Sequence, residues 1–175
     1  MKKIFTLLLV IITIGGYSQT NQPFLDSVSI EMMSYLNKLQ KDSGYSIYND
    51  HPDANKLSEI HTKYMLKHNI ISHKETIGVD VEKYGRAINR LKTLYNNKWW
   101  NVTEVIAARR NFNIEDYTIE ELSTLLINQL INSHYHRIAL LGYPNINRYI
   151  TKFCEFYIAY NPTNKTIYCT GSILY

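Results

Sequence analysis

The C-terminal end of the chain contains two apolar segments that can pair as a β-hairpin. Residues 152–160 and 166–174 are rich in aromatic and β-branched side chains and flank a turn-like sequence at 161–164. Alternate side chains of a strand point to opposite faces, and in the first segment both sets are apolar. They are Cys154, Phe156, Ile158 and Tyr160 on one face and Phe153, Tyr157 and Ala159 on the other. A sheet that is apolar on both faces needs cover on both, so the hairpin predicts helices on its two sides.

The hairpin contains the two cysteines of the chain, Cys154 and Cys169. With a four-residue turn at 161–164, Cys154 lies opposite Gly171. Cys169 lies opposite Phe156 in the same register, so the two sulfurs share a face but are diagonal, at a backbone separation of ~7 Å that strains a bridge. An even cysteine count in an exported chain favours a disulfide. The alternative is two separate half-buried thiols, and the sequence leaves both open.

The N-terminus has the features of a secretory signal peptide. A basic start precedes an apolar run over residues 4–14, and Gly16 and Ser18 supply small residues near a cleavage site. We expect residues 1–18 to be the signal peptide and 19–175 to form one domain. No segment approaches the ~20 apolar residues of a membrane-spanning helix. We therefore expect a secreted or periplasmic protein that is not an integral membrane protein after cleavage.

Charge argues against nucleic acid as a partner. The formal net charge is +4, and it falls to +2 when Lys2 and Lys3 leave with the signal peptide (4 − 2 = 2). Arg109-Arg110 is the only arginine pair, and the sequence has no basic stripe of the kind that phosphate backbones require. We therefore expect the partner to be something other than nucleic acid.

Four helical patterns precede the hairpin. Apolar residues at steps of three and four predict helices over residues 25–39, 53–69, 81–95 and 118–132. The last has the clearest start, because Thr118 and Glu121 form a capping-box pattern. The segment 102–107 is expected to be irregular or briefly helical. Helices followed by a hairpin predict an α+β protein.

Three segments far apart in the sequence each carry a group that can bind a metal ion or a polar ligand. His73 follows the second predicted helix, Glu104 lies in Val-Thr-Glu-Val-Ile-Ala, and His136 lies in Ser-His-Tyr-His-Arg. Two neutral imidazoles and a carboxylate are a sufficient ligand set for Zn²⁺ or another divalent cation, with a fourth position open. The same groups could instead hydrogen-bond a small polar ligand.

The order of these segments resembles the CAP superfamily, also called SCP-like or cysteine-rich secretory protein domains, in its bacterial extracellular branch. The resemblance covers roughly residues 30–175 and rests on Ser72-His73, on Glu-x-Ile-Ala from Glu104, and on Ser-x-x-His-Arg from Ser133, followed by Ile-x-Leu-Leu and the hairpin. It implies a three-layer α-β-α sandwich with a central antiparallel sheet. It also implies that His73, Glu104 and His136 face one another across a solvent-open cleft.

The sequence departs from the family's pattern around these positions. Thr103 and Val105 replace a glycine and an asparagine that flank the family's glutamate. Many animal members have a second glutamate about where Ser133 stands, and without it a hydrolase lacks an obvious base. We expect Ser133, and Arg137 next to His136, to line the cleft as secondary residues beside His73, Glu104 and His136.

These features favour an exported, non-catalytic binding module. Its cleft residues His73, Glu104 and His136 would hold a divalent metal ion or a small polar ligand. Lipid is a further candidate ligand, because the resemblance implies lipid binding in some members. Two alternatives stay open, a metal-assisted hydrolase acting on peptide or cell-envelope substrates and a protein–protein interaction module that binds an envelope component.

Overall fold

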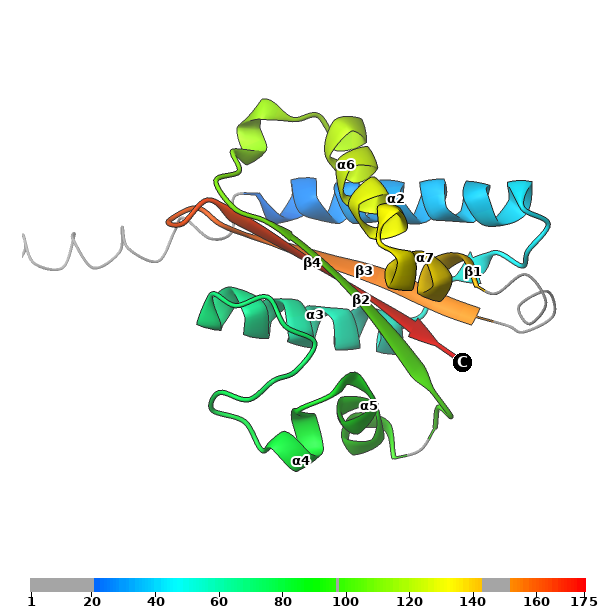
Figure 1. The fold of residues 1–175 in the computed structure, drawn as a ribbon, viewed down its shortest axis with the longest axis vertical. Helices are drawn as coiled ribbons and strands as arrows, with labels where there is room; N and C mark the ends of the chain where they lie inside the picture. The colour runs from blue at the N-terminus through cyan, green and yellow to red at the C-terminus, as the bar shows by residue number, and fades with distance from the viewer. Residues whose placement is uncertain (1–20, 97, 143–151) are drawn as a thin grey trace, which may run out of the picture.

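The protein has an α+β fold (Figure 1). The computed structural model describes residues 21–96, 98–142 and 152–175, so the expected signal peptide lies outside the described residues. The elements in chain order are α2 (Gln22–Asp42), β1 (Tyr48–Asn49), α3 (Pro52–His68), α4 (Val81–Tyr84), α5 (Ala87–Tyr95), β2 (Val102–Arg109), the 3-10 helix η1 (Ile114–Asp116), α6 (Ile119–Asn132), α7 (His134–Leu141), β3 (Lys152–Asn161) and β4 (Thr166–Leu174). Within the described residues, no helix is long and apolar enough to cross a membrane.

The four strands form one sheet in the order β1-β3-β4-β2. The hairpin β3-β4 is present as predicted, and β2 pairs antiparallel with β4. The three long strands are antiparallel, in agreement with the central antiparallel sheet that the resemblance implies, and the two-residue strand β1 is added to β3 in parallel. The prediction that 102–107 is irregular or briefly helical is wrong. Val102, Thr103, Val105 and Ile106 are β-branched residues that favour a strand, and β4 offers them a partner along its whole length.

The turn of the hairpin begins one residue later than expected. Asn161 pairs with Thr166, because its Oδ1 accepts the backbone N–H groups of Thr163 at 3.0 Å and Asn164 at 3.3 Å. This local turn is typical of asparagine, and Lys165 completes it in the left-handed region at φ 50°. The predicted register is therefore wrong by two residues.

The corrected register separates the two cysteines. Cys154 lies opposite Ile173, and Cys169 lies opposite Ile158. Four residues of strand, or ~13 Å, therefore separate Cys154 from the position facing Cys169, which is beyond the reach of a disulfide. Both thiols are free and buried, so the structure has the second of the two arrangements that the sequence left open.

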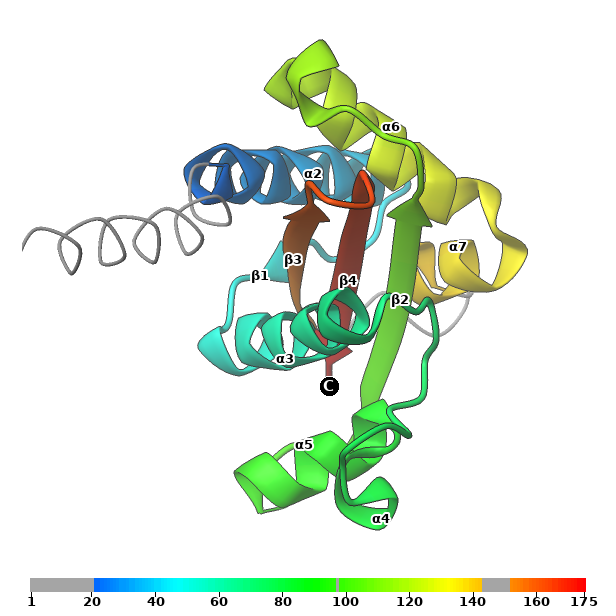
Figure 2. The same cartoon turned by 90° about the vertical axis from the view of Figure 1, so that its left-hand side faces the viewer.

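Both faces of the sheet are covered by helices, as Figures 1 and 2 show. One face packs against α2, α6 and α7, and Phe156, Ile158 and Ile173 are among its buried strand residues. The other face packs against α3 and α5, with Tyr168 and Leu174 buried there. The alternation of side chains along the hairpin accounts for this arrangement, since each face removes its own apolar surface from water.

Two predicted helices need correction. The second begins at Pro52, and its cap is the His51 side chain, whose Nδ1 accepts the Asp53 backbone N–H at 3.0 Å. The third is broken into α4 and α5 at Gly85, where a Cβ atom would lie 2.4 Å from the Val81 carbonyl oxygen. Only glycine allows this close approach. The next residue, Arg86, is extended at φ −129° and starts α5 in a new direction.

Candidate functional site

The fold brings His73, Glu104 and His136 together from three elements. His73 lies in the loop after α3, Glu104 on β2 and His136 on α7. The Nδ1 atom of His73 lies 3.2 Å from Glu104 Oε1, and the ring centres of His73 and His136 are 5.8 Å apart with the planes inclined at 60°. The two imidazoles and the carboxylate are thus neighbours, as the resemblance implies.

Glu104 also belongs to a group of four buried charged or polar side chains, which we call the buried quartet: His61, Glu75, Arg90 and Glu104. Arg90 forms ion pairs with Glu104 Oε2 and, at 3.1 Å, with Glu75 Oε1. His61 Nδ1 lies 2.9 Å from Glu75 Oε1, and His61 Nε2 lies 3.5 Å from Glu104 Oε1. Only 4% of the Glu104 side chain is exposed, so Glu104 forms part of the floor of the cleft, and the rest of the network lies beneath it.

Both ring nitrogens of His61 have hydrogen-bond partners. Its Nδ1 faces the Glu75 carboxylate, and its Nε2 faces the Ser72 carbonyl oxygen at 2.8 Å. The imidazole thus joins the Glu75 side chain to the backbone of the loop after α3. A buried polar network with satisfied hydrogen bonds is stable only while all its members are present.

The surroundings of Glu104 keep it ionised. Burial alone would raise the pKa of its carboxyl group, but the hydrogen bond from His73 and the charges of His61 and Arg90 more than compensate and lower it. The pKa of His136 is also lowered, by burial and by the nearby His73. A neutral His136 retains a nitrogen lone pair that can bind a metal ion or accept a hydrogen bond at neutral pH.

Local hydrogen bonds hold the loop that carries His73 and Glu75. The Tyr64 hydroxyl on α3 accepts the backbone N–H groups of Thr76 at 2.7 Å and Ile77 at 2.8 Å. Ser72 Oγ accepts the Lys74 N–H at 3.0 Å. The Tyr64 contacts tie the loop to α3 just after Glu75, and the Ser72 contact closes a local turn around His73.

Arg90 is positioned by the break between α4 and α5. The Tyr84 carbonyl oxygen at the end of α4 accepts a hydrogen bond from Arg90 Nη1 at 3.1 Å. That carbonyl is free because the helix does not continue through Gly85. The break that contradicts the predicted continuous helix thus helps to aim the guanidinium at the two carboxylates.

His73 opens onto a surface pocket of about 380 Å³. About half of its side chain is exposed, at 49%, whereas His136 is half-buried. The pocket is lined by His73, Lys74, Arg86, Ala87, Ile88, Val102, Thr103 and Glu104. The cleft can therefore admit a small ligand to the exposed side of His73, opposite the Nδ1 atom that contacts Glu104.

The two predicted secondary residues lie outside this cleft. Ser133 joins α6 to α7, and its backbone oxygen accepts the Arg137 N–H at 2.8 Å. The Arg137 side chain is exposed and lines a different hollow together with Tyr45. His134, two residues before His136, is exposed as expected for a helical neighbour that points elsewhere.

Sequence reasoning missed three members of the quartet. His61 lies on the apolar face of α3, four residues from the buried Leu57 and Met65. A polar side chain at such a position requires buried partners, and this signal was present in the sequence. Its partners Glu75 and Arg90 lie on other elements, and only the tertiary structure identifies them.

The described residues offer no ready-made metal site. In residues 21–96, 98–142 and 152–175, no group of three or more His, Cys, Asp or Glu side chains is arranged to hold a metal ion. Both oxygens of Glu104 already have partners, His73 lines the pocket, and His136 lies beside His73 outside the residues that line it. A metal ion in this cleft would therefore need water or another ligand beside the two histidines.

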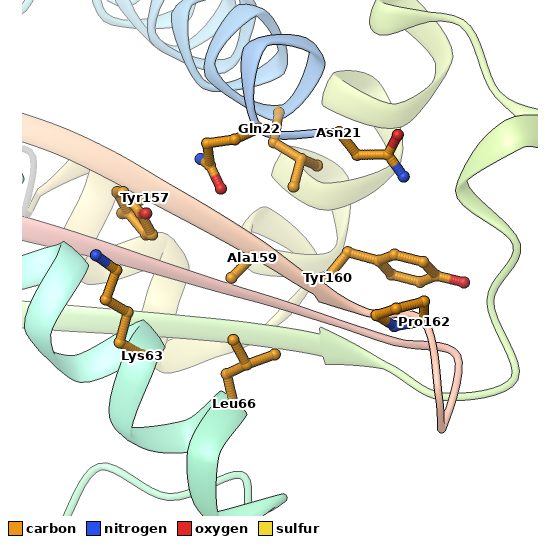
Figure 3. Close-up of a pocket in the computed structure, with 9 residues that line it drawn as sticks. Asn21, Gln22, Lys63, Leu66, Tyr157, Ala159, Tyr160 and Pro162 are labelled. Atoms are coloured by element: carbon orange, nitrogen blue, oxygen red, sulfur yellow. The ribbon is translucent and has the colours of Figure 1, made fainter. Parts of the chain in front are cut away.

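A second, smaller pocket of about 90 Å³ lies between α2, α3 and β3 (Figure 3). Lys63 extends there toward Tyr157, with its ammonium 5.7 Å from the centre of the ring. The same ammonium is paired with Glu59 at 2.5 Å, and the Gln22 amide is bonded to Asp26 at 2.8 Å. The polar groups around this pocket are already engaged, which makes it a weaker candidate than the His73 cleft.

The fold is similar to those of two solved bacterial proteins. An extracellular protein of Bacillus anthracis that contains an SCP domain is similar with a TM-score of 0.56 and 15% identity, over 85% of this chain and 40% of that one. An outer surface protein of Borrelia burgdorferi is similar with a TM-score of 0.62 and 13% identity, over 90% of this chain and 97% of that one. Neither a protein-family model nor a curated protein matches the sequence. At these identities the likeness shows the fold alone.

Proposed function

We propose that this chain is an exported, non-catalytic binding protein with the α-β-α sandwich of SCP-like domains, whose cleft at His73 and His136 holds a divalent metal ion or a small polar ligand. The observation that carries the proposal is the pair of neighbouring imidazoles above the buried Glu104. Export is supported by the two similar structures, one an extracellular protein and the other an outer surface protein.

The hydrogen bond to Glu104 prepares His73 to bind a ligand. Because the ionised carboxylate only accepts hydrogen bonds, Nδ1 is the donor to Glu104, which leaves Nε2 as the nitrogen that can bind a ligand. A carboxylate behind a histidine is the usual arrangement that orients a metal-binding imidazole. We therefore assign Glu104 the role of orienting His73, in place of the direct ligand role that the sequence suggests.

The spacing of the rings supports a shared zinc ion. Two zinc–nitrogen bonds of ~2.1 Å place the nitrogens at most ~4.2 Å apart. Imidazoles whose centres are 5.8 Å apart meet this limit when one nitrogen of each turns toward the other ring. Water or a polar ligand would complete the coordination.

Binding is favoured over hydrolysis by the state of Glu104. A general base must be free to accept a proton and works best with a pKa near the working pH. The Glu104 carboxylate is instead held by Arg90, and its environment lowers its pKa. It is thus poorly suited to activate a water molecule.

Calorimetric titration of zinc into the mature protein, residues 19–175, tests the proposal. We expect one ion per chain, with binding lost in the double variant His73→Ala/His136→Ala. The matched control is His134→Ala, which removes an exposed histidine from the same helix and should bind as the wild type does. Absence of binding by the wild type, or equal binding by the double variant, would remove the metal proposal. In the first case, proton chemical shifts of the two rings during a screen of polar small molecules test the remaining ligand class.

A further inference from the structure

A second groove, far from the His73 cleft in the fold, lies between α6 and the end of β2. It has a volume of about 450 Å³ and is lined by Ala108, Arg109, Arg110, Leu125, Asn128, Gln129 and Asn132. Figure 2 shows the end of β2 beside α6, and Figure 1 shows the same neighbours from another side. The size lies within the range of small-molecule sites, ~300–1,000 Å³.

The helical wall of this groove is a regular polar stripe. Leu125, Asn128, Gln129 and Asn132 are spaced at i, i+3, i+4 and i+7, which places them on one face of α6. The three amides are exposed, and Leu125 is half-buried at the end of the stripe. Each amide can donate and accept hydrogen bonds, a combination that suits the hydroxyl groups of a sugar.

The other wall carries two arginines whose charges are not compensated. Neither Arg109 nor Arg110 has an ion-pair or hydrogen-bond partner for its guanidinium within the described part of the chain. The residues that line the groove include no carboxylate. A planar guanidinium binds a carboxylate or sulfate group through two parallel hydrogen bonds. Two such groups at one end of a groove therefore favour an anionic ligand.

The groove is held in shape by a direct contact between its walls. The Gln129 side-chain amide donates to the Ala108 carbonyl oxygen at 3.2 Å. This bond leaves the amide oxygen of Gln129 available and fixes α6 against β2. A preformed groove loses less conformational entropy when a ligand binds.

We infer that the groove between α6 and β2 is a binding site for an acidic oligosaccharide. Arg109 and Arg110 would hold a uronate carboxylate or a sulfate group, Asn128 and Asn132 would hydrogen-bond the ring hydroxyls, and Leu125 would contact an apolar sugar face. The inference does not depend on the proposed metal or ligand function of His73 and His136, since the two sites share no residue.

Calorimetry with three probes tests this assignment: a galacturonate tetrasaccharide, neutral maltotetraose, and a linear polyphosphate of equal charge. The galacturonate should bind more tightly than either of the others. The variant Arg109→Gln/Arg110→Gln should lose at least about tenfold in affinity, because charge-assisted hydrogen bonds are stronger than those between neutral groups. The variant Asn128→Ala/Asn132→Ala should weaken galacturonate binding and leave polyphosphate binding unchanged.

The variant Lys41→Gln/Lys67→Gln is the matched control, because it removes two exposed positive charges elsewhere on the surface. It should bind galacturonate as the wild type does, at the same ionic strength. Equal affinity for galacturonate and polyphosphate would overturn the inference and leave a general polyanion surface. So would equal losses in the arginine and lysine variants, or failure of all three probes to bind. Zinc titration of the arginine variant should give the wild-type result, which separates this site from the His73 cleft.

Discussion

The buried quartet and the cleft pair use the same kinds of side chain in opposite ways. In the quartet, His61 has an acceptor at each ring nitrogen, and both carboxylates are paired with Arg90. In the cleft, His73 has one nitrogen engaged by Glu104, and its half-exposed ring lies beside that of His136. Histidine and carboxylate in a sequence therefore do not identify a binding site by themselves. A ring nitrogen at the surface that has no partner in the described part of the protein identifies it. Glu104 links the two regions.

Removing the shared cation of the quartet should give the largest effect. Arg90→Met leaves Glu75 and Glu104 without their buried partner, and breaking a buried ion pair in this way costs about 3–5 kcal/mol of unfolding free energy. Urea denaturation followed by circular dichroism measures this loss of unfolding free energy. Lys38→Met, which removes an exposed ion pair with Asp42 on α2, should leave the midpoint unchanged. Equal midpoints for the two variants would show that the quartet does not stabilise the fold.

Removing the histidine of the quartet should have a smaller effect. His61→Leu leaves the Ser72 carbonyl oxygen unpaired and Glu75 with Arg90 as its remaining partner. The expected loss is about 1–3 kcal/mol, the usual cost of an unsatisfied buried polar group. Zinc stoichiometry should stay at the wild-type value if the protein is folded. A variant as stable as the wild type would show that the hydrogen bonds of His61 contribute little to the stability of the fold.

The two regions should respond to acid in different pH ranges. The pKa of His136 is lowered in the folded protein, so the folded state resists its protonation and stability decreases as the pH falls below about 6.5. The pKa of Glu104 is also lowered, and its contribution is present above about 4.5 and is lost as the pH falls below that value.

Unfolding midpoints measured between pH 8 and pH 3 separate these two steps. His136→Gln should remove the first decrease and keep the second, while Glu104→Gln should alter the second. A single transition that is unchanged in both variants would mean that neither group is linked to folding.

The smallest effect on stability is expected in the cleft itself. His73→Ala truncates a half-exposed ring, and such surface changes usually stay within about 0.5 kcal/mol. The same variant should lose zinc binding. A large loss of stability would place His73 with the structural quartet and would weaken the distinction between the two regions.

Local signals in the sequence predicted the fold well where the chemistry is local. The capping box of Thr118 and Glu121 and the end of α6 at Asn132 are confirmed, as are the two strands of the hairpin. The register failed because one asparagine side chain, Asn161, moves the turn by one residue. The strand β2 was missed because its main support is pairing with β4, which is distant in the sequence.

The site was predictable only in part. The resemblance indicated His73, Glu104 and His136 as neighbours, and their proximity in the structure agrees with it. Arg90 gave no local signal, since its role depends on a helix break at Gly85 that aims it across to β2. The partners of a buried charge lie on several helices, strands and loops, so they can be identified only from the tertiary structure.

Imidazole ¹H–¹⁵N correlation spectra recorded during a zinc titration test the central claim most directly. The account predicts that the Nε2 resonance of His73 and the ring resonances of His136 shift together and saturate at one ion per chain. The resonances of His61 should keep their positions. Zinc-dependent shifts at His61, or none at His73 and His136, would contradict the division between a structural quartet and a ligand-binding pair.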